Sequence, residues 1–179
     1  MAAVTYVNAG VSSTNSNAST ISAVAPVTGI VAGDLLIALA GGLNNAGSTV
    51  FTWNTGWTSL GNSIVGNTAV AVAYKIATAA DVATPPTATL TANSGGMYFN
   101  IQVFQYHNAA GVGAVSALAA ASASDTTPGY TTQYANSTAI YLSASYSASG
   151  DTIPSGWTRD SRVVTGSTES TAGHNPILL

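Results

Sequence analysis

The side chains that most often carry out catalysis are few in this chain and lie far apart. There are two histidines, His107 and His174, and neither stands at metal-ligand spacing from another histidine or from a carboxylate. The Gly-x-Ser-x-Gly elbow of serine hydrolases and the Gly-Lys phosphate loop are both absent. His107 follows a predicted strand, where a hydrogen-bonded structural histidine is the common case.

Six carboxylates are the other candidates for chemistry: Asp34, Asp81, Asp125, Asp151, Asp160 and Glu169. They do not form the dense acidic loop that binds calcium. A glycoside hydrolase needs two carboxylates that face each other across a cleft. We keep such a hydrolytic or lectin-like sandwich, using Asp151 or Asp160, as a third hypothesis. Asp34 and Asp151 fit better as acceptors for turn amides. We predict that the chain is not an enzyme and uses no metal or cofactor.

The amino-acid composition limits the classes of partner that the protein is expected to bind. Only 5% of the residues are charged, against about 25% in an average domain, and the formal net charge is −3. Three cations, Lys75, Arg159 and Arg162, are too few to neutralise a nucleic acid backbone. Without cysteine there are no disulfides or thiolate ligands. A surface this neutral gains little solubility from charge repulsion, so we expect the protein to work packed against neighbours.

Two further absences concern targeting. The most apolar stretch, residues 30–42, contains Asp34 and is shorter than the roughly 20 residues that span a bilayer. Residues 1–10 lack a basic start followed by an apolar run, so we expect no secretory signal and synthesis in a cytoplasm. Membrane association is therefore not predicted.

The elements that would position any site are strands, because the dominant hydrophobic period is two. The alternation is clearest in residues 68–77, 97–105 and 138–146. In the first of these, Val70, Val72 and Tyr74 point away from an alanine face suited to close sheet packing. Weaker strand patterns cover residues 4–7, 20–25, 34–40, 49–53, 58–65, 87–92 and 159–165.

Many short strands divided by turn-forming residues predict an all-β, antiparallel β-sandwich. The length fits a single domain over residues 1–179, with a core from about residue 20 to about residue 165. Six side chains are the predicted core anchors: Trp57, Trp157, Tyr74, Phe99, Ile101 and Leu142. Residues 115–123 are rich in alanine and serine without an amphipathic stripe, so we expect an extended or loop segment that has room for a short helix.

The two halves of the sequence share a repeated pattern. A strongly β-prone strand, a polar loop and the tripeptide Gly56, Trp57, Thr58 in the first half are matched by the strand from Ala139 and by Gly156, Trp157, Thr158 in the second. Each unit is predicted to be a strand, a turn and a tryptophan-anchored return strand, and each indole N–H needs a partner if it is buried.

These same segments resemble a jelly-roll-like family of bacteriophage virion proteins. The resemblance rests on residues 33–38, 56–60, 73–77, 103–106, 126–128 and 153–158, and spans roughly residues 30–160. It implies a structural protein of a phage particle, with no catalytic residues to carry over. The sequence after Arg162 departs from the pattern, so the role of residues 163–179 is open.

The leading hypothesis is a capsid decoration (cement) protein on the virion surface. It would form a homo-oligomer, expected to be a trimer, and bind the major capsid protein by buried apolar area alone. The apolar termini, with Val4 and Tyr6 at one end and Ile177, Leu178 and Leu179 at the other, are candidate docking arms.

The alternative hypothesis is a tail-fibre or spike component that binds a host surface glycan. Five aromatic side chains lie near predicted loops and would stack on sugar rings: Trp53, Trp57, Trp157, Tyr130 and Tyr134. The competing interpretation is that the tryptophans plug the ends of the sandwich. Head or tail location, copy number and host are left open by the sequence.

Overall fold

A central antiparallel sheet of six strands forms the middle of the molecule. The computed structural model describes residues 3–45, 50–93, 96–113, 138–145, 153, 155–165 and 168–176. The strands of this sheet are β1 (Thr5–Ala9), β2 (Ser13–Thr14), β4 (Leu35–Asn44), β6 (Thr58–Val65), β7 (Thr68–Ile76) and β9 (Met97–His107). Their order is β1-β9-β4-β7-β6, and β2 pairs with β9 beyond the end of β1.

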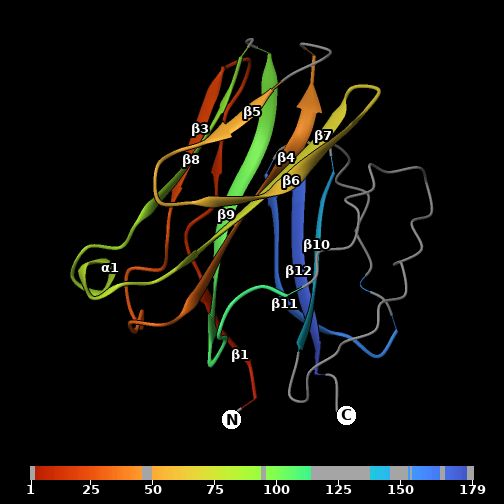
Figure 1. Cartoon of the computed structure of the whole chain (residues 1–179). Helices are drawn as coiled ribbons and strands as arrows, with labels where there is room; N and C mark the ends of the chain where they lie inside the picture. Colours follow the sequence, from red (N-terminus) through yellow and green to blue (C-terminus); the bar gives the residue numbers. More distant parts are fainter. Residues whose placement is uncertain are drawn as a thin grey trace.

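Two three-stranded sheets pack on the two faces of the central sheet (Figure 1). The first has the order β3-β8-β5, with β3 at Thr20–Val24, β8 at Thr87–Ala92 and β5 at Phe51–Trp53. The second has the order β10-β12-β11, with β10 at Thr138–Ser145, β12 at Thr168–Pro176 and β11 at Thr158–Thr165. The predicted all-β architecture of antiparallel sheets packed face to face is therefore present, but in three layers.

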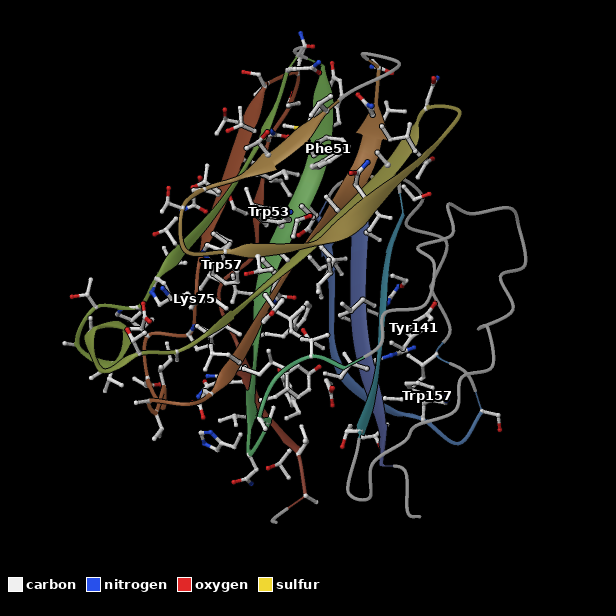
Figure 2. All side chains as sticks on the ribbon, viewed as in Figure 1. Phe51, Trp53, Trp57, Lys75, Tyr141 and Trp157 are labelled. Carbon is white, nitrogen blue, oxygen red and sulfur yellow. The ribbon has the colours of Figure 1, made fainter. Side chains whose placement is uncertain are left out.

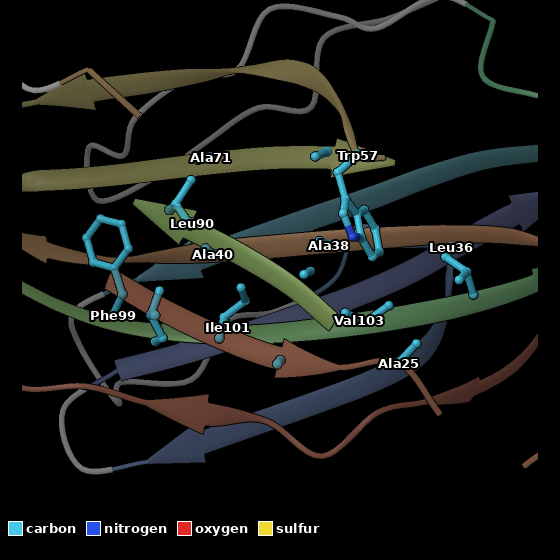
Figure 3. Packing of buried hydrophobic residues seen from close by; sticks show 14 of the residues in the cluster. Ala25, Leu36, Ala38, Ala40, Trp57, Ala71, Leu90, Phe99, Ile101 and Val103 are labelled. Carbon is cyan, nitrogen blue, oxygen red and sulfur yellow. The ribbon is translucent and has the colours of Figure 1, made fainter. Parts of the chain in front are cut away.

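The core between the central sheet and β3-β8-β5 is built from small and large side chains that interlock (Figure 3). Alanines of the central sheet, among them Ala38, Ala40 and Ala71, are fully buried against the first small sheet. Leu90 of β8 and Phe99 of β9 are also fully buried in this cluster. The alanine face of β7 thus lets the two sheets approach closely, as its sequence suggested.

The opposite face of the central sheet carries larger side chains toward β10-β12-β11. Leu35, Ile37 and Leu39 of β4 are buried there, and Ile140 and Leu142 of β10 pack against them. Strand β4 is therefore buried on both faces, which explains why its sequence is a continuous apolar run rather than an alternation. A two-layer sandwich would have left one of these faces polar.

The repeated sequence pattern corresponds to two copies of one three-stranded unit in the structure. Strands β4, β7 and β6 form one unit, and β10, β12 and β11 form a second with the same order. The hairpins share one register: Thr58 pairs with Tyr74 in the first, and Thr158 pairs with His174, one hundred residues later, in the second. Both return strands also carry a β-bulge at the same place, with Leu60 as the extra residue in β6 and Asp160 in β11.

Three elements were not predicted from the sequence: β2, the short helix α1 (Ala79–Ala83) and β12. The residues after Arg162 lie outside the resemblance described above, yet residues 168–176 form the middle strand of the third sheet. The segment 115–123 lies outside the described residues.

Candidate functional site

The first polar cluster joins the loop before β4 to the end of β9. The buried Asp34 carboxylate lies 2.5 Å from Nδ1 of His107 through Oδ1, and its Oδ2 accepts hydrogen bonds of 2.7 Å from the Val31 amide and from Gln105 Nε2. Gln105 also donates to the Gly29 carbonyl at 2.7 Å. The carboxylate thus accepts the turn amide that the sequence suggested, and the histidine has a structural partner.

This cluster has the beginning of a catalytic dyad, since a carboxylate orients an imidazole whose side chain is 34% exposed. A nucleophile or a metal would be needed to complete it. In the described part of the chain, no three histidines and carboxylates come together to hold a metal ion. The bonds of Asp34 instead fix the loop around Gly29 and Val31 to β9.

The second cluster anchors helix α1 to the end of β7. Lys75 Nζ lies 3.2 Å from Asp81 Oδ1, and Asp81 Oδ2 accepts hydrogen bonds of 2.7 Å from the backbone amide and hydroxyl of Thr78. Burial by itself would raise the pKa of Asp81, but the hydrogen bonds from Thr78 and Lys75 outweigh it and lower the pKa. The carboxylate therefore serves as a helix cap and ion-pair partner.

The third cluster lies between the central sheet and the β10-β12-β11 sheet. The hydroxyl of Tyr106, a fully buried residue of β9, donates to Asp160 Oδ2 at 3.0 Å. Nearby, Ser161 Oγ donates to Gln102 Oε1 at 3.3 Å. Because Asp160 is the extra residue of the β11 bulge, the bulge aims its carboxylate at the phenol.

The pKa values of two neighbouring tyrosines, Tyr106 and Tyr6, are raised in this cluster. Burial and the Asp160 carboxylate raise the pKa of Tyr106 well above its usual value, and the same two causes raise the pKa of Tyr6. The two rings meet edge to face with centroids 5.7 Å apart. The hydrogen bonds of this cluster connect the central sheet to the β10-β12-β11 sheet. Among the contacts described, no second carboxylate faces Asp160. Asp151, the other carboxylate of the hydrolytic hypothesis, lies outside the described residues.

One buried amide near this interface has no partner. Asn100 of β9 is fully buried, and neither its side-chain oxygen nor its nitrogen makes a hydrogen bond. It pairs across the strands with Gly41 of β4, on the face that receives β10. The interface toward the second unit is thus more polar than the alanine-rich interface on the other side.

The two Gly-Trp-Thr turns share backbone geometry but differ in surroundings. Gly56 and Gly156 both have positive φ, of 90° and 85°, a conformation that favours glycine. Trp57 is buried, and its Nε1 donates to the Thr87 carbonyl of β8 at 3.1 Å. Trp157 is only half-buried and meets Tyr141 edge to face, with centroids 6.2 Å apart. Figure 2 shows the two tryptophans at well-separated places in the molecule.

The aromatic residues that were candidates for glycan binding differ in their exposure to solvent. Trp57 is enclosed, and Trp53 is half-buried against the alanine-rich core. Trp157 keeps part of its surface exposed beside Tyr141. Tyr130 and Tyr134 lie outside the described residues.

The predicted anchors and arms are distributed as follows. Phe99 and Ile101 are fully buried, and Tyr74 and Leu142 are half-buried against the larger-residue core. Val4 is half-buried against the same core. Tyr6 belongs to β1, where it is opposite Tyr106, so it is part of the central sheet. Residues 177–179, the C-terminal arm, lie outside the described residues.

Sequence reasoning did not predict the three polar clusters as units. The first and third join side chains from strands that are distant in the chain. The second lies within residues 75–81, beside a short helix that was not predicted. The sequence did contain a signal from which the first cluster could have been predicted. Asp34 immediately precedes β4 and His107 ends β9, and these are the two longest apolar strands. Their antiparallel pairing, with Leu35 opposite Tyr106, brings the two polar ends together.

No helix among the described residues is long and apolar enough to span a membrane. Comparison of the chain with protein-family models, with curated protein sequences and with solved structures finds no match. The resemblance to phage virion proteins therefore stays a prediction from the residues quoted above.

Proposed function

We propose that the chain is a non-enzymatic structural protein of a bacteriophage particle, most specifically a jelly-roll-like decoration protein that binds the outside of the major capsid protein shell. The observation that carries the proposal is how the few charged side chains are used. Asp34 holds a loop, Asp81 caps α1 with Lys75, and Asp160 ties two layers together. In all three places the charged side chains stabilise the fold.

The neutral surface is the second support. Six valines are exposed to solvent in the described chain: Val11, Val24, Val27, Val31, Val50 and Val82. Apolar side chains on a surface that lacks charge repulsion favour association by shape and buried area. A decoration protein requires this kind of adhesion, both to copies of itself and to the shell. Oligomers with closed symmetry, such as the proposed trimer, match the symmetry of capsid junctions.

The test is to locate the chain on phage particles. Particles from a host that carries the gene are labelled with an antibody against the chain and viewed in negative stain. We expect label over the head, and particles made without the gene should lose their DNA at a lower temperature. Label confined to the tail, or no label on intact particles, would overturn the decoration role.

A fibre or spike component that binds a host glycan is the second candidate, and the Trp157–Tyr141 pair favours it. Trp157 is half-buried, so part of an aromatic surface is available for stacking on a sugar ring. Titration with host surface polysaccharide should then change tryptophan fluorescence in the natural protein and in Trp57→Phe, but not in Trp157→Phe. A flat response of the natural protein would reject this candidate.

A further inference from the structure

Four of the exposed valines lie within a short part of the chain. The exposed fractions are 82% for Val11, 47% for Val24, 77% for Val27 and 55% for Val31. We call these four residues the valine edge. They border β1 and β3. No other described segment of this length has as many exposed large hydrophobic residues.

Contacts along the backbone bring these residues to one region of the surface. A Cβ placed on Gly10 would lie 2.1 Å from the Val24 carbonyl oxygen, so the chain before Val11 runs tightly against the end of β3. A Cβ on Gly29 would lie 4.0 Å from Cγ1 of Val7, so the loop carrying Val27 and Val31 lies beside β1. The hydrogen bond from Gln105 to the Gly29 carbonyl fixes that loop to β9.

The chain segment that carries these four valines contains no charged residue. Residues 1–33 contain no Asp, Glu, Lys or Arg, and the first charged residue, Asp34, is buried in its own cluster. A partner with an ordinary charged surface would have to leave its own charges desolvated against these residues, which is unfavourable. A surface that is equally neutral meets no such cost, and another copy of the chain supplies one.

The backbone of β1 is poorly suited to extend the sheet into another molecule. Strand β1 lies at the edge of the central sheet, and its pairing with β9 is interrupted by a bulge at Val7, between Tyr6 and Asn8. Bulges of this kind hinder edge-to-edge strand pairing. Contact through side chains, with the exposed valines at its centre, does not depend on strand pairing at β1.

We propose that the valine edge is the surface by which one copy of this chain binds a second copy. The inference deepens the proposed function, because it names the surface used for the self-association that a decoration protein needs. Removal of the exposed valine surface from water is the driving force, and it must exceed the cost of association.

The test compares two double variants of equal charge. Val11→Asp with Val27→Asp places two carboxylates in the valine edge. The matched control, Val50→Asp with Val82→Asp, changes valines that are 63% and 48% exposed at the start of β5 and in α1. Sedimentation velocity at tens of micromolar should give an oligomer for the natural protein and the control. The edge variant should give the 17.7 kDa monomer.

Circular dichroism and the urea midpoint show whether each variant is folded, and Val11→Ser with Val27→Ser replaces the aspartate pair if that pair fails to fold. A monomeric natural protein, or an edge variant that stays oligomeric, would overturn the proposal. Labelling of particles reports separately on the proposed function. If particles are unlabelled and the edge variant alone is monomeric, the phage role is rejected and the valine edge is kept. If particles are labelled but the natural protein is monomeric, the valine edge is rejected and the phage role is kept.

Discussion

Gly41 and Ala144 occupy equivalent positions in the two copies of the duplicated unit, and they meet where the copies pack together. A Cβ added to Gly41 would lie 2.4 Å from the Cβ of Ala144 and 3.1 Å from the Ala69 carbonyl oxygen. The equivalence follows from the registers, since Ile37 pairs with Tyr74 and Ile140 pairs with His174, four residues before Gly41 and Ala144 respectively. Contact between equivalent residues is expected near a pseudo-twofold axis.

We predict that Gly41→Ala destabilises the protein by about 1–3 kcal/mol, because the new methyl group overlaps Ala144 and the layers must separate. Urea unfolding measures the loss. Adding Ala144→Gly should recover part of it, although Ala144→Gly alone is destabilising, so the two changes should be strongly non-additive. Additive effects would show that these residues do not meet.

The two tryptophans of the duplicated turns should respond differently to the same change. Trp57→Phe removes a buried indole and its hydrogen bond to Thr87, at a cost of about 1–3 kcal/mol in the free energy of unfolding. Trp157→Phe, at a half-buried site, should cost less than about 1 kcal/mol. Equal losses in urea unfolding would contradict the difference in environment between the two turns.

Stability should fall in alkali through Tyr106. The pKa of this phenol is raised in the folded protein, so between the unfolded value of about 10 and the folded value the folded state binds more protons. The stabilisation is complete below pH about 10 and is lost as the pH rises toward the folded pKa. Unfolding free energies measured from pH 8 upward should decline less steeply for Tyr106→Phe. An unchanged slope would mean that this phenol does not control alkaline stability.

Asn100→Leu should stabilise the protein by about 1–3 kcal/mol. The leucine side chain is close in shape to asparagine and removes a buried amide that has no hydrogen-bond partner. Chemical denaturation measures the gain, and Gln102→Leu is the matched control on the same face of β9. Gln102 bonds to the Gly10 carbonyl and to Ser161, so its replacement should be destabilising. A loss of stability in Asn100→Leu would show that the amide is satisfied.

Most of the strands could be predicted from the sequence, because alternation of apolar and polar residues is a local property. Strand β7 shows this clearly, since its alanine face and its valine face lie in two different cores. The prediction failed for β12, whose residues Thr168–Pro176 are mostly polar. That segment forms a middle strand because β10 and β11 pair with it on both sides, which no local pattern expresses.

By itself, the sequence determined the neutral composition, the β-rich body and the duplicated Gly-Trp-Thr turn, because all three depend on residue type and short-range spacing. The tertiary structure alone decided that β4 is buried on both faces, that Trp57 is enclosed while Trp157 is not, and that Asp34 meets His107. These outcomes depend on which strands become neighbours and which sheets cover them. Such contacts join residues that are far apart in the chain, so their energies arise only when the layers assemble.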